Sequence, residues 1–134
     1  MPFYQTSYNR GLAEEQRVLP VIRTYFERDI QKINGRFSQH DFVCPDYTYE
    51  LKSRTTKRYA FVDTVVGIDK FDNLSKPLIL LFSFSDCLCY IEYNPDTFKD
   101  YKKTLFGRLD RSVEEAKIHI HIPIKDLIKI VDWE

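Results

Sequence analysis

The sequence has no net charge, because 20 aspartate and glutamate residues balance its 20 lysine and arginine residues. A neutral chain has no overall field that attracts a polyanion, so any binding to nucleic acid must use a local basic patch. The sequence also has no repeats, linkers or low-complexity tracts. Hydrophobic residues make up 43% of the 134 positions, which is typical of a globular protein rather than a disordered one. We therefore expect a single domain over residues 1–134.

Cysteines and long apolar runs are scarce as well. The chain has three cysteines, an odd number, and no charged-then-apolar leader, which favours a reducing compartment over a secreted disulfide framework. The longest apolar run, residues 77–84, is far shorter than the roughly 20 residues that span a membrane. We expect a soluble intracellular protein, in the cytoplasm of a cell or of an infected host, with no membrane partner.

The segment 40–54 organises the chain. Pro45 and Asp46 form a turn signal between two short apolar-rich runs, a pattern that predicts a β-hairpin. With the turn centred there, residue i faces residue 91 − i, and Asp41 then lies across from Glu50. Lys52 shares the face of Glu50, because side chains alternate along a strand. A loop one residue longer would change this register and separate the two acids.

Two carboxylates and an ammonium at this spacing suit phosphodiester hydrolysis, because carboxylates hold a divalent cation and an ammonium neutralises developing charge. The order of Asp41 and Glu50-Leu51-Lys52 resembles the motif of the PD-(D/E)xK nuclease superfamily. The resemblance covers residues 14–76 and is nearest to small nucleases of phages and large DNA viruses. It implies a restriction-endonuclease-like core, with Mg²⁺, or Mn²⁺ in its place, held by Asp41, Glu50 and the Leu51 carbonyl, and with Lys52 at the attacking water.

A helix precedes the hairpin. Apolar residues recur with a helical period over residues 9–33, and Pro20 is expected to kink or restart this helix. Glu15 falls in the middle of the apolar stripe, where a carboxylate is costly unless it is paired or lies near a cation. Many members of the resembled superfamily carry a helical glutamate beside the metal, and Glu15 is the candidate for that catalytic role. Glu14 is a substitute for the same role, and the other explanation for Glu15 is a solvated glutamate in the first turn of the helix.

The densest basic cluster follows the hairpin directly. Beside a phosphate-cleaving site, these cations would hold the nucleic-acid backbone, whereas alone they would form a solvated loop. Tyr59, next in the sequence, can stack on a base or be a half-buried packing residue. Lys70 is expected to reach the same side, as basic residues after the motif strands do in the resembled superfamily. The predicted nucleic-acid-binding residues are Arg54, Lys57, Arg58, Tyr59 and Lys70.

The rest of the chain supplies framework. We expect a short helix or loop over 59–76, strands at 77–84 and 87–93, a helix over 96–106, a polar connection at 110–115, and a helix or coil at 125–131. Strict alternation over 117–124 predicts a strand with its isoleucines inward and with His119 and His121 outward. These histidines form a solvated face or, with a third ligand, a transition-metal site. The fold class is α/β (α+β), a mixed sheet of about five strands flanked by helices.

We therefore expect a divalent-metal-dependent DNA endonuclease, structure-selective or resolvase-like, acting on DNA as a monomer or homodimer. RNA is the open alternative as substrate. Chance alone gives roughly one or two acid-x-Lys triplets in such a chain, and two others occur, at 100–102 and 115–117. Two competing hypotheses follow. One is a catalytically inactive nucleic-acid-binding or assembly subunit with the same fold, and the other is an unrelated protein-interaction domain whose hairpin carries only a surface salt bridge.

Overall fold

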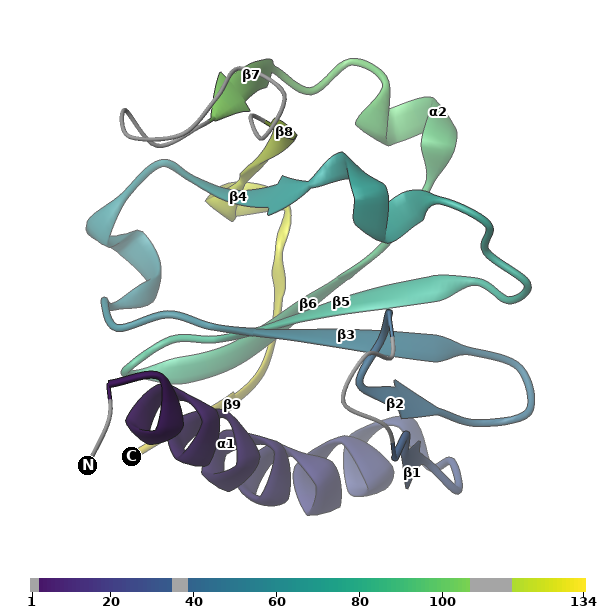
Figure 1. Cartoon of the computed structure of the whole chain (residues 1–134), viewed down its shortest axis with the longest axis vertical. Helices are drawn as coiled ribbons and strands as arrows, with labels where there is room; N and C mark the ends of the chain where they lie inside the picture. Colours follow the sequence, from purple (N-terminus) through teal and green to yellow (C-terminus); the bar gives the residue numbers. More distant parts are fainter. Residues whose placement is uncertain (1–2, 35–38, 107–116) are drawn as a thin grey trace.

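A computed structural model describes residues 3–34, 39–106 and 117–134. Within these ranges the chain forms three layers: one long helix, a six-stranded sheet and a three-stranded sheet (Figure 1). The helices and strands are α1 (Phe3–Phe26), β1 (Gln31–Lys32), β2 (Phe42–Val43), β3 (Thr48–Ser53), β4 (Asp63–Gly67), β5 (Leu78–Ser83), β6 (Cys87–Glu92), α2 (Pro95–Phe98), β7 (Lys103–Phe106), β8 (Lys117–Pro123) and β9 (Ile128–Asp132). Single 3₁₀ turns are η1 (Arg58–Ala60), η2 (Ile68–Phe71) and η4 (Ile124–Asp126).

The larger sheet has the strand order β1-β2-β3-β5-β6-β9. β3 and β5 are parallel, and every other neighbouring pair in it is antiparallel, so the sheet is mixed. The smaller sheet has the order β4-β8-β7 and is antiparallel throughout. The predicted α+β class with a mixed sheet is confirmed, with six and three strands in place of about five.

Strand β5 lies between two hydrophobic cores. All six of its residues are buried, as the continuous apolar run predicts. Leu80 and Phe82 pack in a core shared with the three-stranded sheet, whereas Ile79 and Leu81 pack in a second core against α1. Each such side chain contributes about 1.5–3 kcal/mol when fully buried. β3 follows the same alternation, so Tyr49 faces α1 and Glu50 faces the second sheet.

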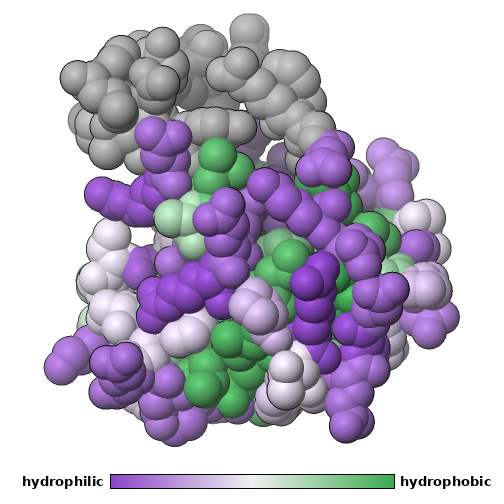
Figure 2. All heavy atoms as spheres, turned by 90° about the horizontal axis from the view of Figure 1, so that it is seen from below, coloured by the Kyte–Doolittle hydropathy of each residue, from purple (hydrophilic) through white to green (hydrophobic). Residues whose placement is uncertain are grey.

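Helix α1 packs its apolar stripe on the larger sheet through Val18 and Ile22, which are fully buried. It runs through Pro20 and ends at Phe26, followed by Glu27 at φ 53°. The prediction that the helix reaches residue 33 was therefore wrong. Ile30 is buried, but it belongs to the chain entering β1, and burial alone does not distinguish a helix from extended chain. Viewed from the α1 side, the surface is mostly hydrophilic, with smaller hydrophobic areas between (Figure 2).

Other predicted elements differ in type. Residues 59–76 contain β4 as well as two 3₁₀ turns, residues 96–106 contain only the end of α2 and then β7, and residues 128–132 form β9. In each case pairing with a neighbouring strand overrides the weak local preference of a short mixed segment. The strands predicted at 77–84, 87–93 and 117–124 are present as β5, β6 and β8. The polar connection predicted at 110–115 lies outside the described residues.

Strand β8 has the predicted alternation, with one exception. Ile120 and Ile122 are buried, whereas Ile118 is 43% exposed near the strand's start. His121 is on the opposite face from these isoleucines, as predicted, but its side chain is mostly covered by contacts with neighbouring strands. No helix among the described residues is long and apolar enough to cross a membrane.

Candidate active site

The hairpin of β2 and β3 has the register that the Pro45-Asp46 turn predicts. Phe42 pairs with Tyr49 and Val43 with Thr48, so paired residue numbers sum to 91. The amide of Cys44 donates to the Tyr47 carbonyl at 2.9 Å and closes the turn. Continued by one residue, this register would set Asp41, which precedes β2, across from Glu50 on β3.

Asp41 does not simply continue the ladder. Its backbone N–H donates to the carbonyl of Tyr49 at 2.9 Å, although Tyr49 is already the register partner of Phe42. Two residues of this strand thus face one residue of β3, which is the pattern of a β-bulge, and a bulge turns a side chain away from its regular direction. The Asp41 carboxylate accepts a hydrogen bond from the Leu51 amide, with 2.7 Å between Oδ2 and N. It therefore lies at the sheet edge, where β2 has ended.

Glu50 is the buried acid of the site, with only 4% of its surface exposed. Its Oε1 lies 3.3 Å from the Lys52 ammonium and 3.4 Å from the Lys70 ammonium. Its Oε2 is buried and has no hydrogen-bond partner. Burial raises the pKa of the Glu50 carboxyl, the Asp41 carboxylate raises it further, and the two lysines only partly offset these effects.

Lys70 comes from the turn η2, which is fastened to the segment entering β2. The side chain of Gln39 donates to the carbonyls of Asp69 at 3.0 Å and Asp72 at 3.1 Å, and His40 Nε2 lies 3.0 Å from the Lys70 carbonyl. In return, the Lys70 ammonium donates to the Gln39 carbonyl at 3.2 Å. These contacts hold the ammonium beside Glu50. Lys70, predicted to bind nucleic acid, thus lies within the carboxylate cluster itself.

Glu15 reaches the same edge from α1. Burial raises the pKa of its carboxyl, and so does the neighbouring Asp41, whereas Lys32, 3.1 Å away, lowers it. Glu14 points elsewhere: it accepts a hydrogen bond from the Ser83 hydroxyl and lies 3.5 Å from Arg17. Of the two helical acids left open by the sequence, Glu15 is therefore the one beside Asp41. Lys32 was not predicted from the sequence, because the two-residue strand β1 that carries it gives no local signal.

The structure thus brings together the predicted residues Glu15, Asp41, Glu50 and Lys52. We define this set, with Lys32 and Lys70, as the carboxylate cluster: three acids and three ammonium groups around the open end of β2. Each ammonium offsets part of the repulsion between the neighbouring carboxylates in this partly buried space.

The oxygen atoms of the carboxylate cluster decide whether a divalent cation fits there. Among residues 3–34, 39–106 and 117–134, no group of three or more His, Cys, Asp or Glu side chains is placed to hold a metal ion. The chemistry of Asp41 and Glu50 nevertheless suits Mg²⁺, which prefers carboxylate and carbonyl oxygens. The unpartnered Oε2 of Glu50 is an oxygen that a cation would satisfy. The Leu51 carbonyl points to the same side of β3 as its amide, toward Asp41.

The basic cluster after β3 is divided between structure and surface. Arg54 donates to the Thr64 hydroxyl at 3.0 Å and to the Val65 carbonyl at 2.7 Å, which ties β3 to β4. Arg58 donates to the Leu127 carbonyl at 2.6 Å. Both arginines are thus engaged with the protein. Lys57 and Tyr59 are exposed, with 72% of Tyr59 accessible.

The comparisons with known proteins give no family for this chain. No protein-family model matches it, and neither the curated proteins nor the solved structures contain a match.

Proposed function

We propose that this protein is a divalent-metal-dependent deoxyribonuclease of the PD-(D/E)xK type, which hydrolyses phosphodiester bonds in DNA. The observation that carries the proposal is Glu50, a buried carboxylate with one oxygen between two ammonium groups and the other without a partner. An unsatisfied buried carboxylate oxygen is costly, and a structural salt bridge does not require one. A cation-binding role explains why this oxygen is kept.

Each residue of the cluster has a distinct task in this proposal. Asp41 and Glu50, with the Leu51 carbonyl, would hold Mg²⁺ or Mn²⁺. When bound, the cation would polarise the phosphate and lower the pKa of a water molecule. Lys52 would orient that water and neutralise charge that develops on the phosphoryl oxygens. Glu15, which lies beside Asp41, would complete the group of acids as an anion, through a second ion or a water molecule.

The raised pKa of Glu50 gives the proposal a definite pH dependence. A protonated Glu50 cannot serve as an anionic ligand, so cleavage is expected to fall as pH drops through its elevated pKa. The Glu15 carboxyl, whose pKa is also raised, acts in the same direction. The profile is therefore expected to rise with pH and then level off.

The test is a Mg²⁺-dependent cleavage assay on linear duplex, branched and single-stranded DNA, with EDTA as the metal-free control. The wild type is expected to cleave at least one of these, and Glu50→Gln none. Glu92→Gln, which changes an exposed acid at the end of β6, is the matched control and is expected to cleave normally. If the wild type binds DNA but cleaves none of the three substrates with Mg²⁺ or Mn²⁺, the inactive DNA-binding subunit is the better description.

A further inference from the structure

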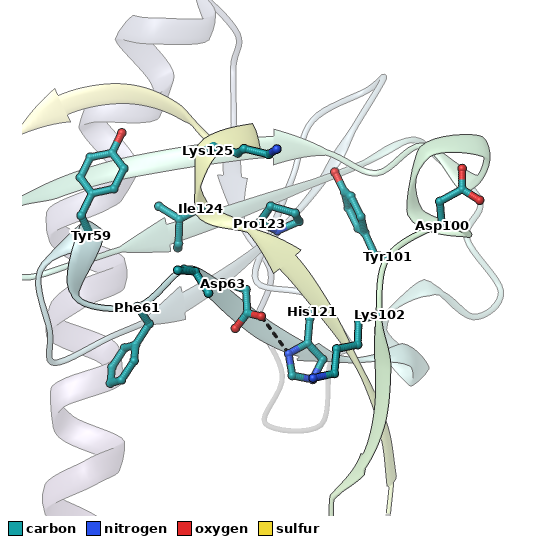
Figure 3. A pocket seen from close by; sticks show the side chains of 11 residues that line it. Tyr59, Phe61, Asp63, Asp100, Tyr101, Lys102, His121, Pro123, Ile124 and Lys125 are labelled. Carbon is teal, nitrogen blue, oxygen red and sulfur yellow. Dashed lines mark hydrogen bonds and ion pairs between the residues drawn. The ribbon is translucent and has the colours of Figure 1, made fainter.

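A cavity of about 620 Å³ lies on the outer side of the three-stranded sheet, formed by residues that the carboxylate cluster does not use. Figure 3 shows Tyr59 and Phe61 on one side of it and Tyr101 on the other, with Ile124 between them. Its size is within the range of pockets that bind small organic groups. The aromatic rings come from segments far apart in the sequence, so the fold itself assembles this space.

The aromatic walls are accessible rather than buried in the protein. Tyr59 is 72% exposed and Phe61 is 66% exposed, although large aromatic side chains usually bury most of their surface. Tyr101 is fixed by a hydrogen bond from its hydroxyl to Asp126 at 2.7 Å. Burial, together with this contact, raises the pKa of Tyr101 to about 12, so it stays a neutral phenol. Accessible rings facing a cavity can stack on a flat partner.

The remaining wall is polar and has a fixed orientation. His121 Nδ1 lies 3.1 Å from Asp63 Oδ2 (Figure 3). The Nε2 atom of the same ring lies 2.7 Å from the Thr104 hydroxyl. When Nδ1–H donates to Asp63, Nε2 accepts from Thr104, and the two hydrogen bonds together fix the orientation of the His121 ring. The Asp63 carboxylate is still 36% exposed and can accept a hydrogen bond from an amino group in the cavity.

Basic residues accompany the cavity. Lys102 and Lys125 are exposed at its rim, which also includes the acidic Asp100 (Figure 3). A second cavity of about 400 Å³ shares Phe61 with the first and includes Lys57 in the loop that leaves β3. Since β3 carries Glu50 and Lys52, the loop continues from the carboxylate cluster to the aromatic cavity. Cations along this path suit the phosphates of a bound strand.

We propose that the aromatic cavity takes one unpaired base of single-stranded DNA. The base lies between Tyr59 and Phe61 on one side and Tyr101 on the other, and Asp63 accepts a hydrogen bond from its amino group. This inference rests on the proposed function, because it assumes a DNA substrate, and it narrows that substrate to DNA with an unpaired segment. Aromatic platforms beside basic residues are the general means by which proteins bind single strands.

The experiment measures binding of a short single-stranded oligonucleotide that contains 2-aminopurine, in EDTA so that no cleavage occurs. Stacking on tyrosine or phenylalanine is expected to quench the fluorescence of the wild-type complex. Phe61→Ala and Tyr59→Ala are each expected to weaken binding by about 5- to 150-fold, the scale of one base–aromatic stack. Ile128→Ala, which shortens a half-exposed apolar residue outside the cavity, is the control and is expected to bind normally.

A second measurement tests the polar wall. Wild-type protein is expected to prefer oligo-dC to oligo-dT, because cytosine presents an amino donor where thymine presents a carbonyl. Asp63→Ala is expected to lose this preference. Equal oligonucleotide binding by Phe61→Ala and Ile128→Ala would overturn the proposal. It would also be overturned if the wild-type protein self-associates and Phe61→Ala abolishes this self-association without changing oligonucleotide binding. If the fluorescence of 2-aminopurine is quenched but no DNA substrate is cleaved, the proposed nuclease activity is wrong and the base pocket stands. If blunt duplex DNA is cleaved but the fluorescence is not quenched, the base pocket is wrong and the nuclease activity stands.

Discussion

The carboxylate of Asp41 accepts a hydrogen bond from the backbone amide of Leu51, with 2.7 Å between Oδ2 and N. Because β2 ends before this point, the carboxylate of Asp41 takes the place of a backbone carbonyl as the acceptor for the Leu51 amide of β3. The bond also turns the carboxylate toward the open edge of the sheet. Here Asp41 is a neighbour of Glu15 from one side and of Glu50 from the other. The two proposed metal ligands thus meet through a local irregularity of the hairpin.

Asp41→Asn is expected to keep the bond to Leu51, because an amide oxygen also accepts, while removing the charge. Since the Asp41 carboxylate raises the pKa of Glu50, this variant is expected to lower that pKa, which an NMR titration of the Glu50 carboxyl carbon measures. Cleavage is expected to fall about a hundredfold or more. Asp46→Asn in the exposed turn is the control, and an unchanged Glu50 titration in Asp41→Asn would contradict the proximity of the two acids.

Glu50→Gln is expected to stabilise the protein at neutral pH and to lose this advantage in acid. Because the folded protein raises the pKa of Glu50, it binds a proton more tightly than the unfolded chain does, and stability falls as pH rises from the unfolded value through the folded one. Below the unfolded value, about 4.3, wild type and variant are expected to converge. Urea unfolding from pH 4 to 8, followed by fluorescence of the single tryptophan, Trp133, measures the difference. If the difference in stability between Glu50→Gln and the wild type grows as the pH falls, the pKa of Glu50 is lowered rather than raised.

Lys52→Ala is expected to abolish metal-dependent cleavage while leaving the fold and most DNA affinity intact. The proposed task of Lys52 is at the water and at developing charge, so its loss falls on the chemical step, about a hundredfold or more in rate. Lys129→Ala, in an exposed ion pair with Asp132, controls for loss of a surface charge. Single-turnover kinetics at saturating protein separate chemistry from binding. Wild-type rates in Lys52→Ala would mean that its triplet is a chance match.

Arg54→Ala and Lys57→Ala are expected to separate stability from binding. Arg54→Ala leaves its Thr64 and Val65 partners without their donor, which costs about 1–3 kcal/mol of unfolding free energy. Lys57→Ala is expected to leave stability unchanged but to weaken DNA binding and reduce the salt slope by about one, because one phosphate contact is lost. Denaturant unfolding measures the stability of the two variants, and fluorescence anisotropy at several salt concentrations measures their DNA binding. Equal stability of both variants would contradict the inter-sheet role of Arg54.

Several features were determined by the sequence because they depend on neighbours along the chain. The Pro45-Asp46 turn set the hairpin register, since two strands joined by a short turn have few ways to pair. The continuous apolar run at 77–84 predicted the doubly buried β5. The alternation at 117–124 predicted which face of β8 is buried. Each pattern repeats within a few residues, and therefore local geometry is enough to read it.

Other features depend on contacts between distant segments, and only the tertiary structure decided them. β4, β7 and β9 are strands because partners elsewhere in the chain pair with them. Lys32 and Lys70 join the acids because β1 and η2 are placed at the end of β2, and Arg54 is drawn into the protein by the carbonyls of β4. A sequence gives a side chain's charge and spacing, but the partners that bury, pair or expose that charge are set by packing. The choice between Glu14 and Glu15 is the plainest case: the residues are adjacent and chemically identical, and the 100° between them on the helix directs one to Ser83 and the other to Asp41.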